Sequence, residues 1–325
     1  MESPPAVPEL TLAHFSDVHL PLPAGRPAMR DLLSKRVLGY LSWRRSRQRI
    51  HRPEVLAALL ADVHRHAPDH IAVTGDLTNL SLPSEFALAR AWLGTVGPAE
   101  RVTVIPGNHD ALVAMPWAEG LGTWREWMRG DDPSGDPGGN PGTDGAFPFV
   151  RVRGRVALVG LSSAVPTAPL LATGRIGAGQ AGRLAAILEE LGRQDLFRIV
   201  LVHHPIHRAG EKRRKSLRDG DRLAGVLARS GAELVLHGHG HVGRLDALPG
   251  PVRPIASLGC SSASARPVGR GHKGEAARWH LLAISRPGPE WQVRVTVRRL
   301  DSAGTGFETV GTYSLAMPAA VSISR

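Results

Sequence analysis

Cysteine is nearly absent from this sequence, which has only Cys260. A single thiol excludes an intramolecular disulfide, and the cysteine content gives no sign of an oxidising compartment. Long apolar runs are also missing: no uninterrupted stretch of about 18 apolar residues occurs, which argues against a membrane-spanning helix. The first ten residues lack the basic and apolar regions of a secretory signal, so we expect a cytoplasmic protein.

Aromatic residues make up only 5% of the chain, which leaves few platforms on which nucleic-acid bases could stack. The net charge of +11 is also local, because residues 26–52 hold nine basic residues and one acidic residue and so contribute +8 of it. A nucleic-acid-binding surface usually spreads its positive charge along a face or a groove. The composition therefore argues against nucleic acid and favours a local anionic partner.

The order of the predicted elements indicates an α/β protein, which we expect to form a single domain over residues 1–325. Residues 131–145, rich in proline, glycine and aspartate, predict an irregular loop. Residues 250–325 are β-rich without a convincing helix and are expected to complete the sheets. Strands are predicted at 10–17, 70–76, 101–107, 156–163, 197–204 and 233–240, and helices at 54–66, 83–93, 179–191 and 219–228.

Polar clusters follow nearly every strand in the first two-thirds of the chain. The carboxyl ends of strands in an α/β sheet share one edge, where ligand crevices form, so we expect these clusters to meet in one site. Aspartate, histidine and asparagine together suit Mn, Fe, Zn or similar divalent ions. The clusters offer more ligands than one metal needs, and a pair of metals is the usual device for displacement at phosphorus. They are Asp17 and His19, Asp76, Asn108 to Asp110, His203 and His204, and His237, His239 and His241.

The ordered motifs D-x-H, G-D, G-N-H-D, H-H-P and G-H-x-H, from Asp17 to His241, resemble the calcineurin-like metallophosphoesterase superfamily. The resemblance extends to its class III cyclic nucleotide phosphodiesterases and its UDP-diacylglucosamine hydrolases. It implies a four-layer α/β/β/α sandwich of two mixed sheets, the metallophosphoesterase fold. It also implies two divalent metal ions and hydrolysis of a phosphoester by a metal-bridging hydroxide.

Carried over motif by motif, the resemblance assigns the metal ligands. One metal would be held by Asp17, His19 and His241, and the other by Asn108, His203 and His239. Asp76 would bridge the two metals. His203 is preferred to His204 because the first histidine of such a pair is the ligand in the relatives.

The resemblance places His109 beside the scissile phosphate, and we include Asn79 and Asp110 with it as catalytic residues. Many relatives have an aspartate where this chain has Asn79, and that aspartate pairs with the catalytic histidine. We expect the Asn79 amide to orient the ring without adding negative charge. The expected result is a weaker general acid, suited to good leaving groups.

The predicted function is therefore a binuclear-metal-dependent phosphoester hydrolase, most simply a phosphodiesterase or pyrophosphatase. Its substrate would be a small phosphate-bearing molecule or a lipid. One alternative is a lipid-linked pyrophosphate hydrolase at the membrane surface. Another is a non-catalytic phosphate- or metal-binding module, which predicts the loss of at least one ligand.

Residues 25–52 form a basic and apolar insert, or cap, between the D-x-H motif and the first long predicted helix. Its central part, residues 35–50, has an apolar half that contains Trp43 followed by an arginine-rich half. Three interpretations stay open: an apolar half packed on the sandwich, a peripheral contact with the inner face of a membrane or with a lipid substrate, and a nucleic-acid arm.

Overall fold

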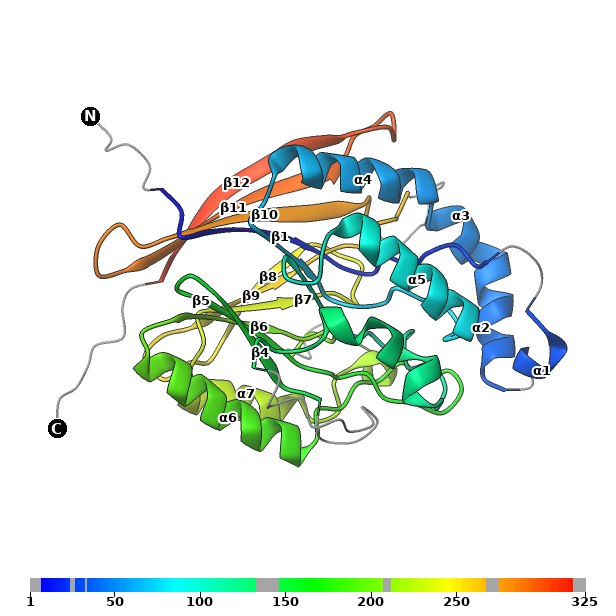
Figure 1. Ribbon diagram of the computed structural model, residues 1–325, viewed down its shortest axis with the longest axis horizontal. Coiled ribbons are helices and arrows are strands. Elements are labelled where there is room, and N and C mark those ends of the chain that lie inside the picture. The colour runs from blue at the N-terminus through cyan, green and yellow to red at the C-terminus, as the bar shows by residue number, and fades with distance from the viewer. Residues whose placement is uncertain are drawn as a thin grey trace.

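The computed structural model describes residues 7–23, 27–32, 34–132, 146–206, 212–266 and 275–317. Residues 25, 26 and 33 of the insert and most of the predicted 131–145 loop lie outside these ranges. Two mixed sheets form the centre of the described chain, and helices cover their outer faces (Figure 1).

The first sheet has six strands within the described residues, in the order β12-β11-β10-β1-β2-β3. Strands β1, β2 and β3 are parallel, while β10, β11 and β12 are antiparallel and continue the sheet from the far side of β1. The helices α4 (Pro53–His66) and α5 (Pro83–Val96) lie against this sheet. The strands are Leu10–Phe15 (β1), His70–Val73 (β2), Val102–Val104 (β3), Arg278–Ser285 (β10), Trp291–Leu300 (β11) and Phe307–Met317 (β12).

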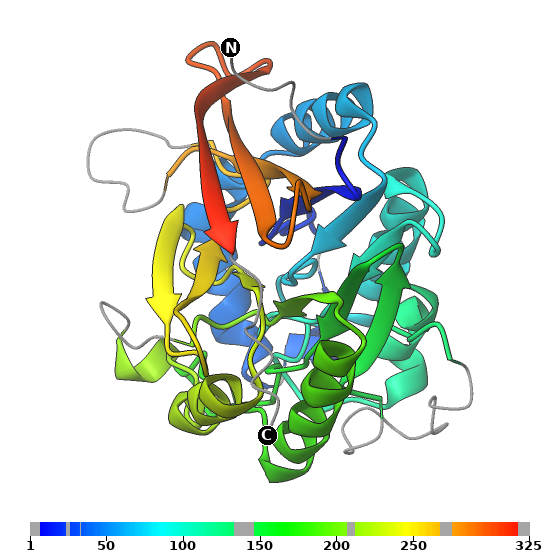
Figure 2. The ribbon, with the colours of Figure 1, turned by 90° about the vertical axis from the view of Figure 1, so that its left-hand side faces the viewer.

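The second sheet, again counted over the described ranges, has six strands in the order β4-β5-β6-β7-β9-β8. Its outer face carries α6 (Ala178–Arg193) and α7 (Gly220–Ser230), coloured green and yellow-green in Figure 2. Strands β5, β6, β7 and β9 are parallel, with β4 and β8 antiparallel at the two edges. The strands are Phe149–Arg153 (β4), Val156–Gly160 (β5), Phe197–Leu201 (β6), Leu234–His237 (β7), Arg244–Leu248 (β8) and Ile255–Gly259 (β9).

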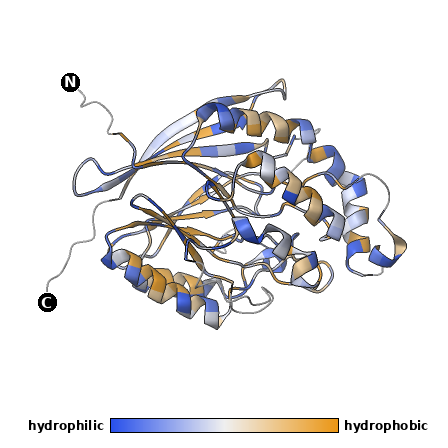
Figure 3. Ribbon diagram, viewed as in Figure 1, coloured by the Kyte–Doolittle hydropathy of each residue, from blue (hydrophilic) through white to orange (hydrophobic). Residues whose placement is uncertain are grey.

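The side-chain alternation of the strands explains why the sheets stack. Successive side chains point to opposite faces, so a strand buried on both sides needs apolar residues at every position. In β5, Leu158 faces the core between the sheets, while Ala157 and Val159 face α6 and α7. The predicted four-layer α/β/β/α sandwich is confirmed, and the ribbon of the central strands is mostly apolar (Figure 3).

The main elements begin and end close to their predicted positions, but three strands and the helices of the insert were not predicted. The missed strands are β4, β8 and β12. The insert contains α1 (Met29–Leu32), α2 (Arg36–Ser42), the π-helical turn η1 (Trp43–Arg47) and α3 (Gln48–Ile50). The other short helices are η2 (Trp117–Glu119), η3 (Leu121–Trp127) and η5 (Arg213–Lys215). Among the described residues, no helix has the length and apolar character to cross a membrane.

The elements α2, η1 and α3, which we call the cap helices, protrude beside the carboxyl ends of β1 and β2 (Figure 1). They are fastened at both ends of the run. At the start, Arg36 donates to the carbonyl of Leu80 at 3.0 Å, and Lys35 donates to the carbonyl of Leu171 at 2.8 Å. At the end, the amide of Arg266 donates to the carbonyl of Ile50 at 2.8 Å. Lys35 and Arg36 therefore serve as structural contacts of the cap.

Candidate metal centre

The seven predicted ligands all follow the carboxyl ends of parallel strands. Asp17 and His19 follow β1, Asp76 follows β2, and Asn108 follows β3. His203 follows β6 in the second sheet, and His239 and His241 follow β7. The structure brings residues from both sheets to one place, as expected for loops at a shared sheet edge.

Asp76 occupies the position between two groups of histidine ligands. Its Oδ2 atom lies 3.8 Å from Nε2 of His19 and 3.4 Å from Nε2 of His203. On the first side, Nε2 of His19 lies 3.4 Å from Nε2 of His241. On the second side, Nε2 of His203 lies 3.3 Å from Oδ1 of Asn108. The geometry is that expected of a carboxylate shared by two ions.

Asp17 and His239 complete the two groups. Oδ1 of Asp17 lies 3.1 Å from Nε2 of His241, and Nδ1 of His239 lies 2.8 Å from Oδ1 of Asn108. The other ring nitrogen of His239, Nε2, is buried and has no hydrogen-bond partner among the described residues. A buried polar atom without a partner is costly unless it binds something.

Five of the seven ligands hold left-handed backbone, with φ between 44° and 68°. This conformation is uncommon for residues other than glycine. It clusters at functional sites, where the surrounding structure holds the strained backbone in place. Here it turns each loop back sharply after its strand, so that the side chain faces the centre. The residues are Asp17, His19, Asp76, His239 and His241.

The imidazole rings are oriented by hydrogen bonds to protein oxygens. Nδ1 of His203 donates to the carbonyl of Thr74 at 2.7 Å, and Nδ1 of His19 lies 3.3 Å from the carbonyl of Thr78. In both rings Nε2 is thereby left to face the centre, the usual arrangement of a metal-binding histidine. His204 differs, because Nδ1 contacts the Ser163 hydroxyl at 2.7 Å and Nε2 contacts the Ala172 carbonyl at 3.2 Å.

Burial and attraction between opposite charges shift the pKa of the site residues in opposite directions. Burial alone would lower the pKa of His203, but the carboxylates of Asp76 and Asp17 raise it to about 9. Burial would raise the pKa of Asp76, but His203, His109 and His19 hold it well below its usual range. The carboxylate is therefore ionised, as a bridging ligand must be.

The donor set fits two divalent ions. It combines carboxylate, amide and imidazole donors without thiolate, converges from loops of both sheets, and contains an orphaned imidazole nitrogen. Asp17, His19 and His241 would hold one ion, and Asn108, His203 and His239 the other, with Asp76 shared between them. These metal-binding roles remain predictions.

His109 is oriented by the main chain of Asn79. Nδ1 of His109 lies 2.8 Å from the Asn79 carbonyl oxygen, so this nitrogen must be the donor. The Asn79 side chain turns elsewhere, and its Nδ2 donates to the carbonyl of Leu20 at 2.7 Å. The expectation that the Asn79 amide orients the ring is wrong, because the backbone oxygen of Asn79 accepts from His109, while the side-chain Oδ1 is buried without a hydrogen-bond partner among the described residues.

Asp110 fastens the loops of the site to one another. Its Oδ2 accepts the amides of Asp76 at 2.8 Å and Gly107 at 2.9 Å, and its Oδ1 accepts the amide of Thr78 at 2.8 Å. Both carboxylate oxygens accept backbone amides, so the contacts of Asp110 are those of a residue that positions the loops carrying Asp76 and His109.

Arg47 of the cap helices and His51, which directly follows them, enter the site and were not predicted individually. Nη1 of Arg47 lies 2.7 Å from Nε2 and 3.1 Å from Nδ1 of His109, and the shorter contact is the one to the nitrogen that is free to accept. His51 packs against the ring of His19 with 4.3 Å between the ring centroids. The amide of His51 donates to the carbonyl of Arg47 at 2.8 Å, so one helical turn carries both. Their four-residue spacing was the only sequence signal, and neither residue follows a strand.

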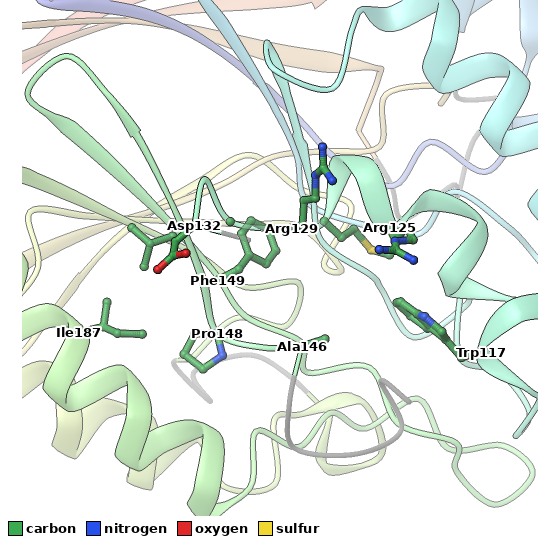
Figure 4. Close-up of a pocket in the computed structure, with 11 residues that line it drawn as sticks. Trp117, Arg125, Arg129, Asp132, Ala146, Pro148, Phe149 and Ile187 are labelled. Carbon is green, nitrogen blue, oxygen red and sulfur yellow. The ribbon is translucent and has the colours of Figure 1, made fainter. Parts of the chain in front are cut away.

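A separate pocket of about 280 Å³ lies between η3 and β4, lined by Trp117, Arg129, Phe149 and Ile187 among others (Figure 4). None of the predicted site residues lines it. The predicted site residues therefore lie at the sheet edge, away from this pocket.

Two mixed sheets that bring two groups of Asp, His and Asn donors to one edge form the arrangement expected of a binuclear metal hydrolase. A family model described as calcineurin-like phosphoesterase matches residues 10–243, well over half of the chain. The protein thus belongs to the calcineurin-like phosphoesterases and is a metal-dependent phosphoester hydrolase.

Solved structures share the fold at low sequence identity. A dimetal phosphatase from Danio rerio superposes with a TM-score of 0.55 at 14% identity, covering 93% of this chain and 99% of that one. Purple acid phosphatase PPD1 from yellow lupin (Lupinus luteus) gives a TM-score of 0.53 at 11% identity, covering 95% of this chain and 54% of that one. No curated protein matches the sequence.

Proposed function

We propose that the protein hydrolyses a phosphodiester or pyrophosphate bond in a small anionic substrate. The observation that carries this proposal is the contact between Arg47 and His109 beside the bridging Asp76. Arg47 adds a cation where the leaving group of a diester or pyrophosphate would lie, and would there offset the charge that develops on it. The basic turn η5 adds Lys215, whose charge acts in the same direction as burial, His204 and His203 to lower the pKa of His239.

Each residue then has a role that follows from its contacts. Two divalent ions, when bound, neutralise phosphate oxygens and make a bound water more acidic. Asp76 lies between the two groups of ligands and would be shared by both ions. His109, fixed through Nδ1 by the Asn79 carbonyl, presents Nε2 to the leaving oxygen, and Arg47 stabilises the charge that develops there.

The test is a substrate panel with Mn²⁺ supplied. It compares bis(p-nitrophenyl) phosphate, cyclic AMP, glycerophosphodiesters, UDP-diacylglucosamine, p-nitrophenyl phosphate and single-stranded DNA. We expect diesters or the pyrophosphate to be hydrolysed faster than the monoester, and Asp76→Ala to abolish the activity. A preference for the monoester would overturn the proposal, and a preference for DNA would replace it with a nuclease.

One observation favours a lipid-bearing substrate as a second candidate. Helix α2 exposes three apolar side chains in seven residues, Val37 at 40%, Leu38 at 41% and Leu41 at 42%. Its other face packs on the core through Gly39, where an added Cβ would lie 2.7 Å from Leu80. Figure 3 shows hydrophilic and apolar positions mixed along these protruding helices.

An exposed apolar face flanked by arginines suits the surface of an anionic membrane, and we propose peripheral contact there. The double variant Leu38→Ser/Leu41→Ser should lose co-sedimentation with phosphatidylglycerol vesicles. Leu170→Ser is the matched control, because Leu170 is 75% exposed but lies outside the cap. Wild-type protein that fails to bind such vesicles at low salt would exclude this candidate.

A further inference from the structure

A third histidine accompanies the pair His19 and His241. One ring nitrogen of each of His19, His51 and His241 lies within 4.8 Å of those of the other two. The His51 ring centroid lies 4.3 Å from that of His19 and 5.7 Å from that of His241. None of the sequence motifs includes His51.

The His51 ring is oriented in the same way as those of His19 and His203. Its Nδ1 lies 2.9 Å from the hydroxyl of Ser264 and 3.3 Å from that of Ser262. Nε2 makes no hydrogen bond within the described part of the chain. One nitrogen fixed by a protein oxygen and one turned toward other donors is the pattern of a metal-binding histidine.

The backbone around His51 is fixed on both sides. The Arg52 amide donates to the carbonyl of Ser264 at 2.9 Å, and His51 forms a β-bridge with Ala265. Ser262, which contacts the His51 ring, donates from its hydroxyl to the carbonyl of Asp17 at 2.6 Å. The same serine therefore couples His51 to the loop that carries a predicted metal ligand.

The His51 side chain is largely removed from solvent. His51 is only 8% exposed, although it ends a run of largely exposed helices. A solvated histidine at the end of a basic segment would have no reason to turn inward against two other imidazoles. A shared ion would give the three rings a common partner.

We propose that His51 is an additional protein ligand, through Nε2, of the divalent ion that Asp17, His19 and His241 would hold. Three imidazoles with two carboxylates form a donor set that suits Zn²⁺, Fe²⁺ or Co²⁺ better than Mg²⁺ or Ca²⁺. The ligand directly follows the cap helices, so metal binding fastens the cap to the edge of the sheets. The inference concerns the metal centre and is independent of which phosphoester is the substrate.

The test is a Co²⁺ titration of metal-free protein, followed by calorimetry, by the visible absorption of bound Co²⁺ and by elemental analysis after gel filtration. Wild type should bind two equivalents. In His51→Ala one equivalent should bind about 10- to 100-fold more weakly, while the other is unchanged. The control is His66→Ala, which removes a half-exposed histidine at the end of α4.

Two further measurements keep the result interpretable. The circular dichroism of metal-free His51→Ala should match that of wild type, which shows that the fold is retained, and His51→Asp should recover much of the lost affinity by restoring a donor. Metal should also slow amide exchange in residues 36–50 of wild type but not of His51→Ala. Two equivalents bound by His51→Ala with wild-type affinity and absorption would overturn the proposal, whatever its effect on substrate turnover.

Discussion

Arg47 donates a hydrogen bond to Nε2 of His109 at 2.7 Å, across 62 positions of sequence. Nδ1 of the same ring must donate to the Asn79 carbonyl, so Nε2 can accept from Arg47 only when the ring is neutral. A substrate oxygen that enters between the two side chains would accept from Arg47 directly, and from Nε2 once that nitrogen carries a proton. The arginine and the histidine are thus paired at the place where the leaving group would be stabilised.

Replacing Arg47 with alanine should lower kcat/KM for a phosphodiester by about 100-fold, the usual cost of removing one donor that stabilises developing charge. The metal content should stay at the wild-type value, because Arg47 supplies no ligand atom. Steady-state kinetics and elemental analysis measure the two quantities.

Arg45→Ala is the matched control, since Arg45 lies in the same helical turn and is exposed. It should leave kcat/KM within about twofold, because exposed charges far from a reacting centre are screened. Equal losses in both variants would indicate a general effect of cap charge and would exclude a specific role for Arg47.

Replacing Asn79 with aspartate should reduce stability without strengthening the acid. Its Nδ2 donates to the buried Leu20 carbonyl, so the carboxylate would leave that acceptor without a donor, at a cost of about 1–3 kcal/mol. The Asn79 carbonyl would still orient His109. Denaturant unfolding should show the loss, while the dependence of kcat on leaving-group pKa stays parallel to that of wild type.

Asn79→Ala serves as the comparison, because it removes the same hydrogen bond without adding a charge. A flatter leaving-group dependence in Asn79→Asp than in Asn79→Ala would show that an acidic side chain at this position does reach the ring.

Removing metal should lower the unfolding midpoint of the whole chain. The ligands come from both sheets, so ions that bind only the folded state stabilise it by about 2.7 kcal/mol at a free concentration 100 times the dissociation constant. Differential scanning calorimetry with EDTA and with added Mn²⁺ measures the shift. In Asp76→Ala the midpoint should no longer respond to Mn²⁺, and a retained response would show that the ions bind elsewhere.

Acid should destabilise the fold through a histidine remote from the metal centre. Burial, together with Arg153, Arg151 and Arg101, lowers the pKa of His70 from 6.5 to about 3. Between these values the unfolded chain binds a proton that the folded chain excludes, so the unfolding free energy falls as pH drops from 6.5 toward 3.

The His70→Gln variant, which keeps a polar group near the Thr103 hydroxyl that His70 contacts at 2.7 Å, should show a shallower fall in this range. Urea unfolding of metal-free protein at several pH values from 4 to 7 measures it, with the half-exposed His66→Gln as control. Parallel curves for wild type and His70→Gln would contradict the prediction.

The sequence could predict the ligands because their position in the fold is visible in it. Each follows an apolar run, and parallel strands bring their carboxyl ends together, so Asp17 and His203 were predicted from the same pattern although 186 positions separate them. His51 follows short helices instead, and its partner Ser264 lies more than 200 residues away. Only tertiary structure shows that such a residue faces the site.

The other differences have equally local causes. Sequence motifs give the identity of side chains, so they suggested the side-chain amide of Asn79 as the partner of His109. They could not indicate that the backbone carbonyl of Asn79 takes this role. Strand β8 is a short edge strand with alternating exposure, and β12 contains Gly311 among polar residues. Both lack the continuous apolar runs that revealed the buried strands.

The left-handed backbone at Asp17, His19, Asp76, His239 and His241 has a consequence for how the stability of this protein is distributed. Each such residue costs about 1 kcal/mol relative to ordinary backbone, so together they offset about 5 kcal/mol, a sum comparable with the net stability of a small domain. Glycine would relieve this strain and remove the ligand in the same step. At Asp17 and Asp76 glycine would also remove the carboxylates that accept the amides of His239 and His109, so these strained residues combine a ligand role with a structural role that glycine cannot fill.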